Sequence, residues 1–138
     1  MFLNILDASA LLALIKKEHG WQTVEKLLLG SEKNITSVFI HAINYTEFLY
    51  KCEKIFGPAK TNMIIADFEQ PFFGVVNYWD KNLSFFTANL KANYHLSLAD
   101  ATGLAHTKIM NGTFWTADAA LEKIAAAEEI KLRLIRPT

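Results

Sequence analysis

Apolar positions along the chain fall into two alternating patterns. Short apolar runs such as Leu3–Leu6 are typical of buried strands, and Asn34–Ile40 adds the β-branched and aromatic residues that strands favour. Between such runs, apolar residues recur with helical spacing, first from Ser9 to about Lys17. The pattern therefore predicts strands that alternate with helices.

The same reasoning divides the whole chain. The predicted strands are Leu3–Leu6, Asn34–Ile40, Pro71–Asn77, Thr113–Thr116 and Leu132–Ile135. The predicted helices are Ser9–Lys17, Trp21–Leu29, His41–Phe56, Pro58–Phe68, Trp79–Asn93, a helix from Ser97 or Asp100 to Asn111, and Ala119–Ala127. Alternation of this kind predicts an α/β fold with a mostly parallel five-stranded sheet and helices on both faces. Without a linker or repeat, residues 1–138 are expected to form a single domain.

Composition narrows the class of protein. The chain has 138 residues, is 51% hydrophobic and has a formal net charge of zero, which suits one apolar core. Its single cysteine, Cys52, excludes an internal disulfide and a cysteine-based zinc site, and is expected to be a small buried apolar residue. Because the chain has no signal-like N-terminus and no apolar run of bilayer length, we expect a cytoplasmic protein with no membrane contact.

Four carboxylates stand where one predicted element gives way to the next or on a helix face. Asp7 follows the first strand, Asp118 follows T-F-W-T, Asp100 begins A-D-A-T-G, and Glu47 lies in the amphipathic stretch H-A-I-N-Y-T-E-F. Residues that follow parallel strands meet at one edge of the sheet, where ligands bind. Clustered carboxylates repel each other, so at least one should have a raised pKa, and Mg²⁺ or Mn²⁺ is the expected counter-charge.

Each acid also has a purely structural interpretation. Asp7, Asp100 and Asp118 each fit an N-cap position, and Glu47 alone fits a solvated helix residue. Convergence on one edge favours the site, because independent capping does not require all of the caps to face one cleft.

Polar neighbours extend the candidate site. Ser9 either caps its helix or binds a phosphate or a metal-bound water. Asn44 lies three residues before Glu47, on the same helix face, while Lys51 is placed for a salt bridge with that carboxylate. Thr116 precedes the last acid by two residues, so both point the same way along a strand. No histidine has metal-ligand spacing or a clear role as a general base.

Three segments together resemble a known family. The start I-L-D-A-S-A-L-L-A-L, the middle N-Y-T-E-F, and the end Y-H-L-S-L-A-D-A-T-G-L-A-H through N-G-T-F-W-T-A-D are similar, in order, to the motifs of PIN domains. The likeness is greatest to the VapC toxins of bacterial toxin–antitoxin pairs. Ala119 and Ala120 depart from the pattern, because many relatives carry a further acid or a phenylalanine there.

The resemblance implies a metal-dependent endoribonuclease toxin. Asp7, Asp100 and Asp118 would be the main Mg²⁺ or Mn²⁺ ligands, and Glu47 would bridge or position the attacking water. RNA would be the substrate, a VapB-like antitoxin the partner, and a homodimer the expected assembly. The apolar helical segments N-M-I-I-A-D-F and L-S-F-F-T-A-N-L pack in the core by default, and the resemblance implies that they also support the dimer and a groove for the antitoxin. Five lysines are candidates to contact RNA or else are solvated surface: Lys16, Lys17, Lys51, Lys54 and Lys60.

Two rival interpretations stay open at this point. An acid-cluster phosphatase or a receiver-like phosphotransfer domain also gathers acids at strand ends, but it would want paired acids after the first strand, where Ala8 and Ser9 follow Asp7. A non-catalytic α/β interaction module is the other rival, and the intact set of acids argues against it.

Overall fold

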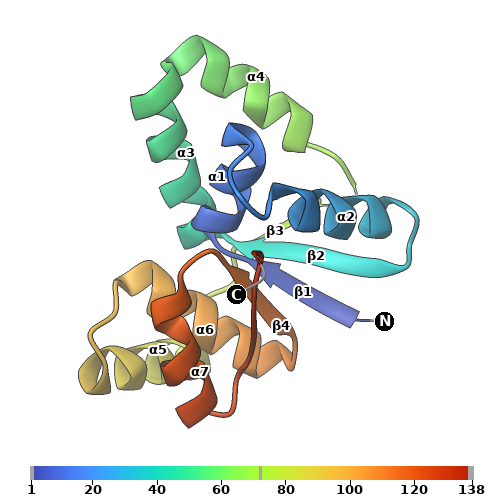
Figure 1. Cartoon of the computed structure of the whole chain (residues 1–138). Coiled ribbons are helices and arrows are strands. Elements are labelled where there is room, and N and C mark those ends of the chain that lie inside the picture. The colour runs from blue at the N-terminus through green and yellow to red at the C-terminus, as the bar shows by residue number, and fades with distance from the viewer. Residues whose placement is uncertain (1, 72, 137–138) are drawn as a thin grey trace.

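The computed structural model describes residues 2–71 and 73–136 and contains a five-stranded sheet with helices on both faces (Figure 1). The strands are β1 (Phe2–Leu6), β2 (Thr36–His41), β3 (Phe73–Val76), β4 (Thr113–Thr116) and β5 (Lys131–Leu134). Their order across the sheet is β3-β2-β1-β4-β5, and every pairing is parallel. The predicted α/β fold is confirmed, and the sheet is parallel throughout.

Helices connect each strand to the next. They are α1 (Ala8–Lys16), α2 (Trp21–Glu32), α3 (Ala42–Phe56), α4 (Pro58–Phe68), α5 (Lys81–Asn93), α6 (Leu98–Met110), the 3₁₀ turn η1 (Ala119–Leu121) and α7 (Glu122–Ala127). Most boundaries differ from the prediction by one to three residues. Helix α2 was expected to end at Leu29 and continues through Gly30 to Glu32, and the helix expected over Ala119–Ala127 is divided into η1 and α7. The third strand was expected over Pro71–Asn77 and is Phe73–Val76, with Phe72 outside the described residues. Helix α5 begins after Trp79, because the Asp80 side chain caps it by accepting from the Leu83 N–H at 2.8 Å.

Two apolar cores lie on opposite faces of the sheet. Helices α1 to α4 cover one face, and α5 to α7 cover the other (Figure 1). Successive β1 residues point to opposite faces, so Leu6 packs under the first group and Ile5 under the second, and both are fully buried. Cys52 is fully buried in the first core, as expected for a small apolar residue.

The strand order locates the place where a ligand can bind. The chain builds outward from β1 through β2 to β3 and then crosses to β4 on the other side of β1. In open α/β sheets the crevice at such a switch lies outside the carboxyl ends of the two central strands. Here those ends are Leu6 and Thr116, so the residues that follow them, Asp7 and Asp118, flank the crevice.

None of the helices in the described part of the chain combines the length and the apolar character needed to cross a bilayer.

Candidate active site at the carboxyl edge of the sheet

All four predicted acids line one small pocket of about 140 Å³. Its lining residues are Asp7, Ala8, Ser9, Asn44, Glu47, Lys51, Asp100 and Asp118. They come from the first turns of α1 and α6, from the first three turns of α3, and from the loop after β4. The structure thus brings the acids together from four separate segments, while their catalytic and metal-binding roles stay predictions.

Asp7 is the most buried of the four acids in this pocket. Its side chain is 3% exposed, and Oδ1 accepts from the Ser9 hydroxyl at 2.7 Å and from the Ala10 N–H at 2.9 Å. Asp7 therefore caps α1 and faces the pocket at once, so the capping interpretation and the site interpretation both hold for its geometry. Burial raises the pKa of Asp7 to about 6, against the lowering effect of its hydrogen bonds, and the charge on Asp100 adds a smaller contribution.

Two hydroxyl groups tie Asp7 to the end of β4. Thr116 Oγ1 donates to Asp7 Oδ2 at 2.6 Å and accepts from the Asp118 N–H at 3.1 Å. Ser9 Oγ accepts from the Ala117 N–H at 2.9 Å while it donates to Asp7. Ser9 is not the helix cap that one interpretation expected; it joins α1 to the loop after β4. The network holds the Asp7 carboxylate in one orientation.

Asp100 lies in the first turn of α6, but it is not the residue that caps this helix. Ser97 caps α6, because its hydroxyl accepts from the Asp100 N–H at 3.1 Å. The capping interpretation of Asp100 is therefore wrong, and its carboxylate is left for the pocket. Burial raises the pKa of Asp100, and the charges of Glu47 and Asp118 raise it further. The mutual repulsion predicted for the acids is thus present, although burial is the larger cause for both raised carboxyls.

Asn44 lines the pocket and has a buried side-chain oxygen without a partner in the described part of the chain. Its Nδ2 donates to the Ala99 carbonyl at 3.0 Å, which links α3 to α6, but Oδ1 is buried and has no hydrogen-bond partner among the described residues. Such an acceptor costs about 1–3 kcal/mol unless a water, a cation or another donor meets it. Gly103 makes this arrangement possible, because a Cβ there would lie 2.7 Å from the Phe114 ring and 3.1 Å from Asn44 Nδ2. Sequence reasoning missed Gly103, which appeared only as a small residue within A-D-A-T-G-L-A-H.

Glu47 is held by a neighbour on its own helix. Lys51 Nζ lies 2.9 Å from Glu47 Oε1, the predicted i,i+4 pair, and this pairing raises the pKa of Lys51. Asp118 in turn caps η1, since its Oδ1 accepts from the Ala120 N–H at 3.0 Å. Over residues 2–71 and 73–136, no three acidic, histidine or cysteine side chains are arranged as a ready metal-ligand set. The carboxylates share a pocket, but those of Asp7, Glu47 and Asp118 are each bound to a partner within the protein.

The histidines lie away from this pocket. His106 is fully buried on α6 with both ring nitrogens unpartnered among the described residues, and its ring meets that of His41 edge-on at 5.4 Å between centroids. Burial lowers the pKa of His106 to about 4, with a smaller effect from His41. His41 itself caps α3, where Nδ1 accepts from the Ile43 N–H at 3.2 Å. Neither ring lines the acidic pocket.

The chain belongs to the PIN domain family, whose model matches residues 5–127. The family match covers β2, β3, β4 and the end of β1, and it includes every residue of the acidic pocket. No curated protein sequence matches the chain significantly.

Several solved structures share the fold. A chain of VapBC2 from Rickettsia felis, bound to a DNA fragment from their promoter, is similar with a TM-score of 0.74 at 14% identity, covering 96% of this chain and 98% of that one. A chain of DNA-bound VapBC from Salmonella typhimurium has a TM-score of 0.72 at 17% identity, and the match covers 98% of this chain and 99% of that one. A chain of VapBC-1 from nontypeable Haemophilus influenzae has a TM-score of 0.69 at 11% identity, and the match covers 97% of this chain and 98% of that one. At these identities the likeness establishes the fold.

Proposed function

We propose that this protein is a VapC-like toxin, a Mg²⁺- or Mn²⁺-dependent endoribonuclease that hydrolyses RNA phosphodiester bonds and is neutralised by a VapB-like antitoxin. The observation that carries the proposal is the shared pocket of Asp7, Glu47, Asp100 and Asp118 at the switch point of the sheet. Membership of the PIN family and the VapBC neighbours support it.

The donor set fits a hard divalent cation. The pocket is lined by carboxylates and by Asn44, whose buried Oδ1 has no hydrogen-bond partner among the described residues, and oxygen donors are what Mg²⁺ and Mn²⁺ prefer. The raised pKa values of Asp7 and Asp100 show that negative charge is unfavourable there without a counter-charge. Asp7, Asp100 and Asp118 would hold the ion, directly or through water. Glu47 is paired with Lys51, so in this proposal Glu47 must turn from Lys51 before it can act on the site.

The chain's own groups then have distinct roles. A bound divalent cation supplies an acidified water and offsets charge on the phosphate. Asp7 is orientated by Ser9 and Thr116, so its carboxylate does not have to be ordered during the reaction. Glu47, once turned from Lys51, accepts a proton from the attacking water, and the Lys51 ammonium remains to offset the negative charge of the phosphate.

The partner follows from the same proposal. Large apolar side chains are exposed on α3 and α4, among them Tyr50, Ile55 and Met63, the last of them 70% exposed. An exposed apolar surface of this kind suits an antitoxin segment or a second copy of the chain. A homodimer is part of the proposal.

RNA cleavage by purified protein tests the enzymatic proposal. Wild type should cleave single-stranded RNA in Mg²⁺ or Mn²⁺ and not in EDTA. Asp7→Asn and Asp100→Asn should lower the rate at least about a hundredfold, because each removes a charge that holds the cation. Asp67→Asn, an exposed aspartate on α4, is the matched control and should cleave like wild type. Cleavage that persists in EDTA, or that survives Asp7→Asn at the wild-type rate, would refute the mechanism.

Growth of expressing cells tests the toxin proposal separately. Expression of the wild type without its antitoxin should halt growth, whereas Asp7→Asn should be tolerated at equal protein level. Cleavage in vitro without arrest would leave a PIN nuclease that is not a toxin. Isothermal titration that detects no Mg²⁺ or Mn²⁺ binding would favour a non-catalytic interaction module.

A further inference from the structure

A second and larger pocket adjoins the acidic one. It has a volume of about 450 Å³ and is lined by Ser9, Leu12, Ala13, Lys16, Glu18, His19, Ala117 and Arg136. Ser9 lines both pockets, and Ala117 is the residue whose N–H binds the Ser9 hydroxyl at 2.9 Å. The two pockets are therefore neighbours across a single hydrogen-bonded contact.

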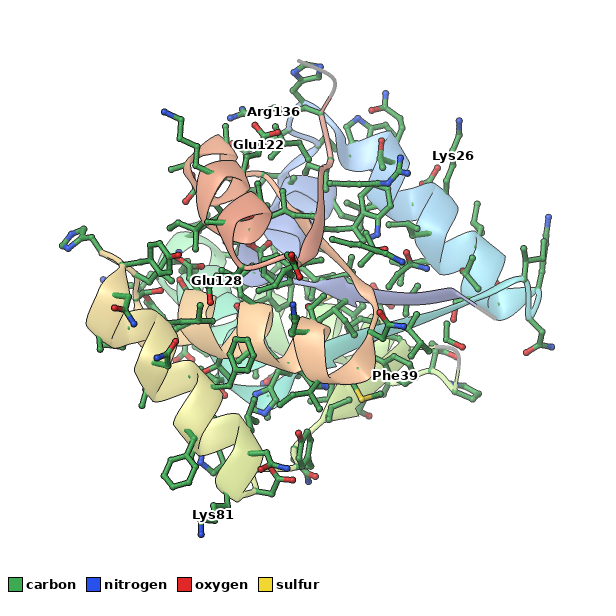
Figure 2. The ribbon with its side chains drawn as sticks, turned by 90° about the horizontal axis from the view of Figure 1, so that it is seen from below. Lys26, Phe39, Lys81, Glu122, Glu128 and Arg136 are labelled. Atoms are coloured by element: carbon green, nitrogen blue, oxygen red, sulfur yellow. The ribbon has the colours of Figure 1, made fainter. Side chains whose placement is uncertain are left out.

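Arg136 reaches this pocket for a reason rooted in the sheet. It follows β5 as Asp7 follows β1 and Asp118 follows β4, and the Ile135 N–H donates to the Thr116 carbonyl at 3.0 Å. This bond places Arg136 at the carboxyl edge of the sheet, beside the loop that carries Asp118. Figure 2 shows Arg136 at the outer end of the chain segment that follows β5.

The pocket wall has two chemically different parts. Leu12 and Ala13 of α1 form a buried apolar floor. Lys16, His19 and Arg136 bring basic groups to its rim, and Glu18 opposes them with one carboxylate that lies 3.6 Å from Lys16. At neutral pH the rim carries two full positive charges against one negative, while the acidic pocket next to it is negative.

We propose that this second pocket holds the nucleotide adjacent to the scissile phosphate of a single-stranded RNA. The base lies against the floor of Leu12 and Ala13, and its phosphate lies between Lys16 and Arg136. This inference rests on the proposed function, since it names a substrate subsite of the same active centre.

The arrangement favours RNA over an acidic protein segment. A strand whose scissile phosphate lies at the acidic pocket can continue over Ser9 into this cavity, because the two pockets share that wall. The volume of about 450 Å³ lies within the range of pockets for small organic ligands and so accepts a base with its ribose. Recognition of single strands combines a positively charged groove with side chains against which the bases lie. Here the cationic rim is present, and Leu12 and Ala13 offer aliphatic contact where other proteins use aromatic rings.

Binding of fluorescein-labelled oligoadenylate, measured by anisotropy in EDTA, tests the subsite without requiring catalysis. Arg136→Gln and Lys16→Gln should each raise Kd about fivefold and make the dependence of log Kd on log salt concentration shallower by about 0.7, the value for one lost phosphate contact on a single strand. Glu18→Gln should act in the opposite direction and lower Kd, because it removes the opposing charge. Arg133→Gln is the matched control, since Arg133 is an exposed arginine on β5 outside the pocket.

The outcomes separate this inference from the proposed function. If the protein cleaves RNA but Arg136→Gln and Lys16→Gln leave both Kd and KM at wild-type values, the subsite is refuted and the nuclease stands. If the protein does not cleave RNA but the variants shift Kd as expected, the binding pocket stands without the enzyme. If the variants weaken binding of a poly-glutamate peptide and leave oligoadenylate binding unchanged, the pocket serves a protein partner and the inference fails.

Discussion

The pKa of the buried Asp7 carboxyl can be tested through its effect on the stability of the folded protein. Burial raises its pKa from 3.8 to about 6, which corresponds to about 3 kcal/mol of folding free energy lost when the group is ionised in the metal-free protein. Between pH 3.8 and about pH 6 the folded state holds more protons than the unfolded state, so the free energy of unfolding decreases as pH rises. This contribution to stability is therefore present below pH 3.8 and is lost as pH rises through about 6.

Asp7→Asn removes the ionisation while it preserves the shape of the side chain. The amide oxygen can keep the bonds from Ser9 and Ala10, and the amide N–H₂ can donate to Thr116 Oγ1, whose hydroxyl must then turn away. Such rearrangement costs about 1 kcal/mol and does not depend on pH. We therefore compare the free energy of unfolding of Asp7→Asn with that of the wild type. The linkage relation predicts that this difference is more favourable to the variant at pH 7.5 than at pH 4.5 by about 2 kcal/mol.

Urea denaturation at these two pH values, in EDTA, measures that difference through the linear extrapolation of unfolding free energy. At pH 7.5 the variant should be more stable by about 1–2 kcal/mol, or about 3–8 °C in Tm. Asp67→Asn is the control and should change stability by less than about 0.5 kcal/mol at both pH values. If the gain from Asp7→Asn is the same at pH 4.5 and pH 7.5, burial does not govern this carboxyl and the reasoning is wrong.

Three further predictions address the surroundings of the pocket. Millimolar Mg²⁺ or Mn²⁺ should raise the Tm of the wild type, and Asp100→Asn should reduce that rise in a thermal-shift assay, because ligand binding to the folded state stabilises it. Gly103→Ala should lower stability by about 1–3 kcal/mol in urea despite the better helix propensity of alanine, because its Cβ would meet the Phe114 ring at 2.7 Å; an unchanged or higher midpoint would contradict the packing described here. His106→Leu should protect the protein against acid, because the lowered pKa of this imidazole means that stability is lost as pH falls from 6.5 toward about 4. Circular dichroism across that interval should show that the variant unfolds at a lower pH than the wild type. If both unfold at the same pH, the burial of an uncharged imidazole does not govern acid stability.

Local chemistry predicted much of this molecule because strands, helices and caps depend on residues close together in the chain. The alternation of apolar runs with helical spacing predicted the order of elements, and the positions of Asp7 and Asp118 after strands predicted that they would meet at one edge of the sheet. The i,i+4 pair of Glu47 and Lys51 follows from helix geometry alone. Boundaries were less accurate where caps compete, as at Asp100, where Ser97 does the capping.

Only the tertiary structure decided which polar groups are buried and what they face. Ser9 meets Ala117, 108 residues away in sequence, and the unpartnered oxygen of Asn44 depends on α3 packing against α6. The raised pKa of Asp7 arises from burial by several elements at once, which no local pattern encodes. The pocket that contains Arg136 likewise exists because β5 pairs with β4 and brings Arg136 to α1. The periodicity of a segment indicates which of its faces is apolar. The burial and the electrostatics of a site depend on many residues that are distant in sequence, and only the tertiary structure brings those residues together.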